Sequence, residues 1–304
     1  MAVQARVAVR PAVQAQARRG PAAGRVVLHG FLIAMCAVWL FPLVWAVYEA
    51  FRPVGDTVLH GYVSLPHQPL TFGNFVSAWV NADLPHYYLN TLAVAVPGVV
   101  LTLLVASMLA FAISQFSWKF NVLVLLIFTA GNLLPQQVII IPLYWVYLNT
   151  PMPPLLSDNG LLYDQYIGVI LIHVVFQTGF ATFVLSNYMK TITREITESA
   201  LVDGANILRI WWSVILPLCR PALAAMATLL FTFIYNDFFW ALVLMETGAK
   251  RPIVSALNNL QGEYFINYDL LGAGALLAAV PSILVFVAFQ RHFVRGLTLG
   301  ATKG

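Results

Sequence analysis

Inside its long apolar segments the sequence carries few side chains that could do chemistry. Most of them are amides, with two carboxylates and one histidine: Glu49, Asn132, Gln136, Gln137, His173, Gln177, Asn236 and Asp237. Polar groups in apolar spans are costly and usually face a protein interior or water. The candidate lining for the path of a polar solute is Gln136, Gln137, Gln177, Asn236 and Asp237. For Asn236 and Asp237 a hydrogen bond that fixes two packed helices is an equal alternative. For His173 we expect a packed core position.

The sequence predicts neither a catalytic centre nor a metal site. No cluster of His, Asp and Glu shows metal-ligand spacing, and no nucleophile motif occurs. The phosphate-binding pattern G-x-x-x-x-G-K-[ST] is also missing, so this chain is not expected to hydrolyse ATP itself. We therefore expect a protein that is not an enzyme.

The composition indicates a membrane protein. Of the 304 residues, 60% are hydrophobic and 9% are charged, whereas a soluble domain carries roughly 25% charged residues. The mean hydropathy is +0.81. These values exclude a disordered chain, a disulfide-stapled secreted domain and an ordinary soluble enzyme. The predicted fold class is an all-α polytopic membrane protein.

Six apolar segments are long enough to cross a bilayer, which takes about 20 residues. They cover residues 26–51, 87–114, 120–148, 166–189, 221–245 and 270–290. The third contains Gly131, Pro135 and Pro142, so we expect a kinked or broken helix there. Glu49 lies at the end of the first span, where an interfacial position is expected. Residues 26–304 then form the transmembrane domain, and residues 1–25 a flexible basic tail.

The basic residues set the expected orientation. All of the 16 Lys and Arg residues except Arg52, Lys250 and Arg251 lie in the tail, in the 190–220 connection or in other gaps on the same side. The positive-inside rule places those gaps, and both termini, in the cytoplasm. Because the net charge of +4 is distributed in this way, it points to lipid and membrane orientation and not to nucleic acid.

The connection at residues 190–220 does not have the composition of a simple loop. A short helix capped by Thr193 or Thr197 is expected to run to about residue 203 and to end at Gly204, which accepts a left-handed conformation. A second helix should run from Ala205 to about residue 216, and Pro217 should then turn the chain into the fifth span. An amphipathic connection at the membrane surface without a specific partner is the alternative.

Three parts of this connection resemble the EAA loop of ABC importer permeases. They are Glu198-Ser199-Ala200, Asp203-Gly204-Ala205 and Ile215-Leu216-Pro217. Asn74 and Phe75 before the second span, Asn90-Thr91 at its start and Asn236-Asp237 in the fifth are similar to the carbohydrate-uptake, maltose-type branch. The resemblance runs from about residue 26 to the end of the chain, including the last residues around Gly300 and Lys303. Ser199 replaces the usual alanine, and Tyr235 the usual tryptophan.

The resemblance implies that separate subunits hydrolyse ATP and form the membrane path. The EAA loop would be a coupling helix that docks on a cytoplasmic ATPase, with ATP and Mg held by the ATPase subunits and no cofactor in this chain. The implied partners are two ATPase subunits, a second permease subunit or a second copy of this chain, and an extracytoplasmic sugar-binding protein facing residues 246–269. The implied location is the bacterial plasma membrane.

The resemblance also implies roles for individual residues of the loop. Glu198 is the expected charged contact to the ATPase, or else it solvates its own helix. Gly204 makes the turn, and Asp203 either starts the second helix or contacts the partner. The implied coupling set is Glu198, Ser199, Ala200, Asp203, Gly204, Ala205, Ile215 and Pro217.

The implied function is import of a sugar or oligosaccharide by ATP-driven alternating access. Within the same class, import of glycerol phosphate or a polyol is the alternative; the spans contain no Lys or Arg to bind an anion. From another class, an ion-coupled secondary transporter would need coupling sites in the membrane, and this chain offers little beyond Asp237.

Overall fold

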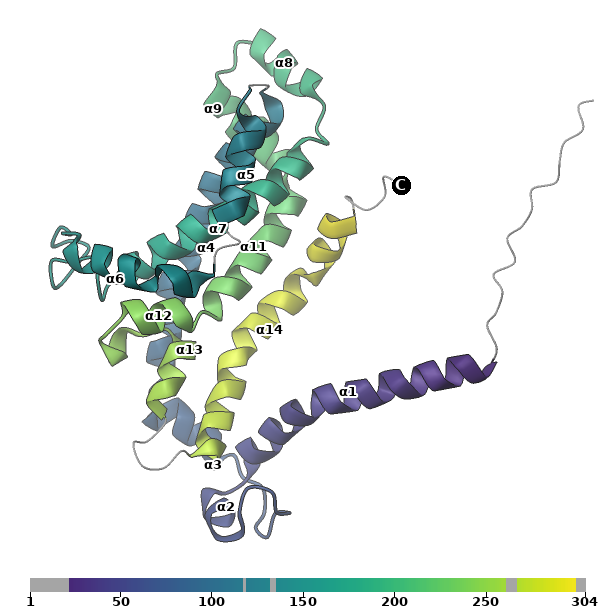
Figure 1. Ribbon diagram of the computed structural model, residues 1–304, viewed down its shortest axis with the longest axis vertical. Helices are drawn as coiled ribbons and strands as arrows, with labels where there is room; N and C mark the ends of the chain where they lie inside the picture. Colours follow the sequence, from purple (N-terminus) through teal and green to yellow (C-terminus); the bar gives the residue numbers. More distant parts are fainter. Residues whose placement is uncertain (1–21, 117–118, 132–134, 261–266, 299–304) are drawn as a thin grey trace, which may run out of the picture. The chain divides into compact units, whose positions relative to one another are not determined.

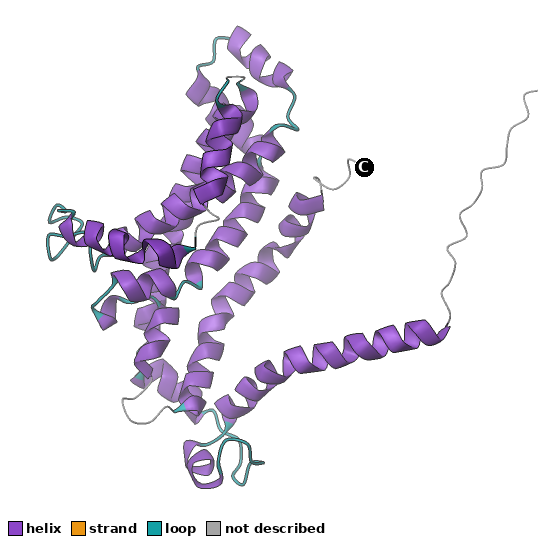
Figure 2. Ribbon diagram, viewed as in Figure 1, coloured by secondary structure: helices purple, strands orange, loops and turns teal. Residues whose placement is uncertain are grey.

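The computed structural model of the protein describes residues 22–116, 119–131, 135–260 and 267–298 (Figure 1). In these ranges every regular element is a helix, and the only strand-like feature is one isolated antiparallel bridge between Pro151 and Leu161 (Figure 2). The all-α fold class is therefore confirmed. The predictions that fall on the basic tail, on Gly300 and on Lys303 lie outside the described residues.

The chain divides into two compact units, residues 1–46 and residues 47–304. The described part of the first unit belongs to α1 (Ala22–Phe51), a helix of 30 residues. Its most apolar stretch has a mean hydropathy of 2.2 and contains no buried residue. Large apolar side chains such as Trp39 and Phe41 are exposed along it. A helix that is apolar on all sides is suited to lipid or to an apolar partner.

Four long helices form the centre of the second unit: α4 (Leu84–Gln115), α7 (Tyr166–Met189), α11 (Arg220–Tyr235) and α14 (Tyr268–Thr298). Helix α4 packs along α7 and α11, and α11 also packs along α14 (Figure 1). Small residues let the helices approach closely. A Cβ atom on Gly98 of α4 would come within 3.1 Å of the Ile234 side chain of α11.

The third apolar segment is broken, as predicted. It consists of α5 (Asn121–Gly131), the 3₁₀ turn η2 (Gln136–Ile139) and α6 (Ile140–Asn149), and the two arms lie at 86°. Pro135 has extended backbone and starts η2. Pro142 lies in the first turn of α6, where a missing N–H costs little.

The fifth predicted apolar segment, 221–245, is divided between two helices. Helix α11 ends at Tyr235, and α12 (Phe239–Leu244) begins three residues later. The cause lies in the two polar residues of the gap. The Asn236 amide donates to Thr232 O at the end of α11, and the Asp237 carboxylate accepts the N–H groups of Trp240 and Ala241 at the start of α12.

Among the residues that the structure describes, four single helices are long and apolar enough to cross a membrane, and the number rises to six if each of two bent pairs forms one span. Shorter elements connect them. They are α2 (Val54–His60), α3 (Gly73–Val76), η1 (Ser77–Asn81), α8 (Arg194–Val202), α9 (Ile207–Ile210), η3 (Trp211–Ile215), α10 (Leu216–Leu218), η4 (Gly248–Lys250), α13 (Ile253–Ala256) and η5 (Leu257–Leu260). Helices α8 and α9 lie at one end of the second unit, and α2, α3 and α13 lie toward the other (Figure 1).

Candidate functional site

Helices α8 and α9 form a hairpin whose turn is made by Gly204. The backbone of Gly204 has φ +80°, which a residue without Cβ adopts at little cost. Its N–H donates to Leu201 O and the N–H of Ala205 donates to Ala200 O, both at 3.0 Å. This pair of bonds is a Schellman motif, which satisfies the last carbonyls of α8. The helix end predicted at residues 202–203 is confirmed.

The second helix of the hairpin starts at a different residue from those considered in the sequence. Asn206 caps α9, because its side-chain oxygen accepts the N–H of Arg209 at 2.8 Å. Asp203 ends α8 and does not start α9. Thr193 has the backbone position of an N-cap for α8, but its side chain makes no capping hydrogen bond. The turn expected at Pro217 comes at Cys219, where the helical axis bends by 81° into α11.

The tip of the hairpin presents an apolar surface flanked by polar groups. Val202 is 88% exposed, and Leu201, Ile207 and Leu208 are also exposed. Polar or small residues surround them: Glu198, Ser199, Asp203 and Gly204 are all exposed. A Cβ atom on Gly204 would meet nothing within 4 Å, so the outside of the turn is open. We name the exposed side chains from Glu198 to Leu208 the hairpin tip.

The inner side of the hairpin is fixed to the bundle. Ile210 and Ile215 are fully buried, while Ala200 and Ala205 pack partly against the same core. The buried Thr197 hydroxyl donates to Gln115 Oε1 of α4 at 2.9 Å, and Gln115 Nε2 donates to Met189 O of α7 at 3.1 Å. The hairpin is thus linked to the ends of two long helices. Neither Thr197 in this role nor Gln115 was predicted, because only the fold brings these residues together.

Of the predicted coupling residues, the structure brings six to the turn of the hairpin and separates two. Glu198, Ser199, Ala200, Asp203, Gly204 and Ala205 lie at or beside the turn. Ile215 belongs to the core, and Pro217 lies partly buried in α10 near the bend. These two positions support the hairpin and shape its connection to α11.

The second candidate group lies around the break between α11 and α12. His173 Nε2 of α7 lies 3.4 Å from Asp237 Oδ2, and both side chains are at least 90% buried. The packed core position expected for His173 is confirmed, and its imidazole also faces the Asp237 carboxylate. Sequence spacing gives no signal for this pairing, since the residues lie on different helices.

The other residues of the predicted path do not lie together beside the break between α11 and α12. Gln177 is half-buried on α7, one turn after His173. Asn236 is exposed, and its amide is used by Thr232 O of its own helix. Gln136 and Gln137 lie in η2 next to Pro135, half-buried and exposed respectively. Asn132 lies outside the described residues.

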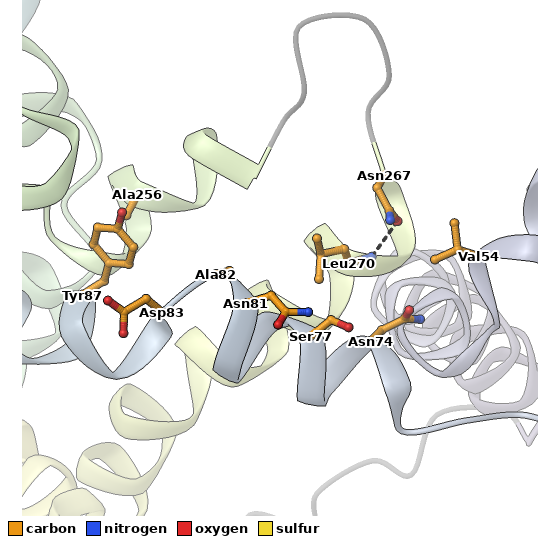
Figure 3. Close-up of a pocket in the computed structure, with 10 residues that line it drawn as sticks. All are labelled: Val54, Asn74, Ser77, Asn81, Ala82, Asp83, Tyr87, Ala256, Asn267 and Leu270. Carbon is orange, nitrogen blue, oxygen red and sulfur yellow. Dashed lines mark hydrogen bonds between the residues drawn. The ribbon is translucent and has the colours of Figure 1, made fainter.

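At the other end of the second unit, α3, η1, α4, α13 and α14 surround an open pocket of about 590 Å³ (Figure 3). Polar side chains line much of it: Asn74, Ser77, Asn81, Asp83, Tyr87 and Asn267. Asp83 has a positive φ of 50° immediately before α4. Asn267 starts α14, because its side chain accepts the N–H of Leu270. None of the described lining side chains is basic.

Ion pairs tie the connections together at this same end. Lys250 Nζ lies 2.6 Å from Asp158 Oδ2 and donates to Asp164 O at 3.0 Å. Hydrogen bonds from Lys250 and Gln165 hold the pKa of the Asp158 carboxyl at about 2, below its usual range. Asp164 also accepts from the N–H of Thr247. The 150–165 and 246–251 connections are thereby joined.

A second charged group stands between α1, α2 and α14. Arg52 is fully buried, and its Nε lies 2.8 Å from Asp56 Oδ2 and its Nη1 3.8 Å from Glu49 Oε1. Burial is the largest single influence and disfavours ionised Asp56. The hydrogen bonds from Arg52 and from the N–H of His67, with the charge of Arg52, together outweigh it, so the pKa of Asp56 lies below its usual value. The Glu49 side chain is 4% exposed beside Arg52 at the end of α1, and its expected position at the membrane interface stays a prediction.

Comparison with known proteins gives consistent results. Residues 98–299 match the family described as "Binding-protein-dependent transport system inner membrane component". The arabinooligosaccharides transport system permease protein AraQ of Halalkalibacterium halodurans is 32% identical over 279 residues, which cover 90% of this chain and 93% of that protein. The diacetylchitobiose uptake system permease protein NgcG of Streptomyces coelicolor is 28% identical over 90% of this chain and 88% of that protein.

The fold is also similar to a solved structure. A subunit in the crystal structure of a bacterial ABC transporter involved in the import of the acidic polysaccharide alginate aligns with a TM-score of 0.70 and 24% sequence identity. The alignment covers 89% of this chain and 96% of that chain. The helical fold of this chain is therefore shared with a chain of that crystal structure.

Proposed function

This chain belongs to the family of inner-membrane components of binding-protein-dependent transport systems, and we propose that it is a permease subunit that imports a sugar or oligosaccharide. Family membership makes it a multi-pass protein of a bacterial plasma membrane. Relatives named for arabinooligosaccharide and diacetylchitobiose uptake support the substrate class. We place both termini and the α8–α9 hairpin in the cytoplasm, because most Lys and Arg residues lie in those connections.

The hairpin tip is the observation that carries this proposal. Four exposed apolar side chains surround a glycine turn at the end of the bundle, with Glu198 and Asp203 beside them. A short helix with apolar anchors and a polar rim is suited to a groove on a partner protein. The EAA pattern lies on this turn, so we assign the groove to a cytoplasmic ATPase subunit. That subunit would hold ATP and Mg, since the G-x-x-x-x-G-K-[ST] pattern is missing from this sequence.

The link from the hairpin to the bundle supplies a route for coupling. When an ATPase subunit moves the hairpin, the Thr197–Gln115 hydrogen bond transmits the displacement to α4, and the bond from Gln115 to Met189 O transmits it to α7. Both helices run along α11 or pack beside it. Movement of these helices in relation to a second permease subunit would open the path alternately to each side.

The break between α11 and α12 is the part of the path that we assign to this chain. Asp237, Asn236 and Gln177 offer oxygen and nitrogen atoms to hydroxyl groups, with Gln136 and Gln137 at the other broken helix. No Lys or Arg lies within the predicted spans. A path without basic groups favours a neutral saccharide over glycerol phosphate or another phosphate ester. A polyol shares the same chemistry and stays the alternative substrate.

The proposal is tested at Gly204. The Gly204→Asp variant places a side chain at a positive φ and adds a charge to the hairpin tip, so it should lose ATP-driven sugar uptake while still inserting into the membrane. Gly204→Asn is the matched control, because asparagine tolerates the left-handed conformation and adds no charge. Uptake by membrane vesicles and the amount of inserted protein are measured together. Normal uptake by Gly204→Asp would refute the coupling role.

The subunit composition is tested separately. Gentle detergent purification of the chain from native membranes should recover an ATPase, a second permease or second copy, and a sugar-binding protein. Recovery of the chain alone under several mild conditions would instead favour an ion-coupled secondary transporter. In that case, uptake should depend on an ion gradient and on Asp237.

A further inference from the structure

Three potential metal ligands meet at the surface of α2, at the opposite end of the unit from the hairpin tip. Asp56 and His60 lie one helical turn apart on α2, and His67 comes from the segment that follows. One ligand atom from each residue can be chosen so that all three lie within 4.8 Å of one another. The spacing was not recognised in the sequence, because the loop that returns His67 to α2 is set by the fold.

We propose that Asp56, His60 and His67 bind a divalent transition-metal ion, with Zn²⁺ as the best fit. Two imidazoles and one carboxylate, with a fourth position open to water, form a common three-ligand zinc set. Nitrogen ligands and mixed nitrogen and oxygen sets favour zinc over Mg²⁺ or Ca²⁺, which prefer oxygen alone.

The distances at this site suit such an ion. Asp56 Oδ1 lies 3.1 Å from His60 Nδ1 and 3.8 Å from His67 Nδ1. Ligand atoms about 2 Å from a tetrahedral zinc ion are separated by about 3.3 Å. His60 Nδ1 also lies 3.1 Å from Asp56 O, so the metal would replace the proton in that contact.

The imidazole rings need a small adjustment to share an ion. They are stacked with their centroids 3.9 Å apart and 15° between their planes. The two Nδ1 lone pairs therefore lie in nearly parallel planes, and they converge on one ion only when the rings tilt apart. The side chains of His60 and His67 are 38% and 54% exposed, so they have room to turn.

The carboxylate, in contrast, is already held in place. Asp56 is fully buried, and Arg52 Nε holds its Oδ2 at 2.8 Å. The N–H of His67 donates to both carboxylate oxygens at 3.2 Å. Ligating carboxylates are commonly oriented by such outer hydrogen bonds. With Oδ2 taken by Arg52, Oδ1 is the oxygen that faces the two imidazoles.

A bound ion would also stabilise the charge distribution around Arg52. Glu49 and Asp56 both lie within 4 Å of this one guanidinium, and Asp269 of α14 accepts the hydroxyl of Thr57, the residue after Asp56. Carboxylates thus outnumber Arg52 in this group. A divalent cation at Asp56 would add positive charge and would tie α2 to the segment that carries His67.

The test is calorimetric titration of Zn²⁺ into the detergent-purified full chain, stripped of metal and carrying a tag without histidines. One equivalent per chain should bind, with at least about 10-fold weaker binding in both His60→Ala and His67→Ala. His86→Ala is the matched control, because His86 is an exposed histidine outside this cluster. It should bind Zn²⁺ as the unmodified chain does.

A second readout separates a specific site from surface binding. Saturating Zn²⁺ should raise the thermal unfolding midpoint of the unmodified chain and of His86→Ala, but not of His60→Ala or His67→Ala. The absence of one-to-one binding, or equal binding by all the variants, would overturn the proposal. If His60→Ala fails to fold, His60→Gln replaces it.

Discussion

The two ends of the second unit are held together in different ways. The α8–α9 hairpin depends on backbone hydrogen bonds at Gly204, on the Asn206 cap and on one buried polar link, Thr197 to Gln115. The opposite end is held by charged side chains, Arg52 with Asp56 and Lys250 with Asp158, that tie connections together.

This difference fits two mechanical roles: the hairpin end can be displaced by a partner, and the α2 end resists displacement. A hairpin closed by its own backbone keeps its shape when it is displaced, so a partner can move it as one piece. A buried ion pair such as that of Arg52 with Asp56 resists displacement, because separating its partners leaves a buried charge without its counterion. We therefore expect the α2 end to be the stable end and the hairpin end to be the coupled one.

The largest expected effect is at Arg52. Arg52→Ala leaves Asp56 and Glu49 buried without their cation, and breaking a buried pair in this way costs about 3–5 kcal/mol of stability. Thermal unfolding of the purified protein measures the loss. Arg209→Ala, an exposed arginine of the hairpin, is the control and should change stability by less than about 0.5 kcal/mol. Equal losses of stability in Arg52→Ala and Arg209→Ala would contradict the expected difference between the α2 end and the hairpin end.

The next effect is expected at Asp237, between the two ends. Asp237→Ala removes the acceptor for two N–H groups of α12 and the partner of His173, so about 1–2 kcal/mol of stability should be lost. Sugar uptake should fall while the ATPase subunits still co-purify. Asp237→Asn, which retains one acceptor oxygen, is the control. If Asp237→Ala fails to accumulate in the membrane, the residue serves packing and not the path.

A smaller effect should separate coupling from stability at the hairpin. Thr197→Val keeps the side-chain shape but leaves Gln115 Oε1 without its donor, which costs about 1–2 kcal/mol. ATP hydrolysis by the assembled transporter should continue while uptake per ATP falls. Thr197→Ser restores the donor and should restore uptake. An unchanged ratio of uptake to hydrolysis in Thr197→Val would show that the link carries no coupling.

The smallest effect is the pH response of the Asp158–Lys250 pair. The pKa of Asp158 is lowered to about 2 in the folded protein, so its contribution to stability is complete above the unfolded value of about 3.9. That contribution is lost as the pH falls from about 4 to about 2. Unfolding followed across this window should show a shallower decline in Asp158→Asn. An identical decline in both proteins would show that the pair contributes nothing.

Local patterns in the sequence were enough for the membrane fold and the hairpin. The apolar segments predicted the helices, because each one exceeds the length that a bilayer requires. Pro135 and Gly131 predicted the broken third segment, since proline removes a helical hydrogen bond. Gly204 predicted the hairpin turn, because its left-handed backbone favours a residue without Cβ. These features depend on neighbours in the chain.

Tertiary structure decided the features that depend on distant residues. Asp237 faces His173 because the fold places α7 beside the break between α11 and α12. Thr197 meets Gln115 because the fold places the hairpin at the end of α4. Asp56, His60 and His67 meet only because the chain folds back after α2. The sequence by itself determined which segments form long apolar helices and where the hairpin turns, since hydropathy and local sterics govern these features. Only the fold determined which polar groups meet, because each pairing depends on distances between separate elements.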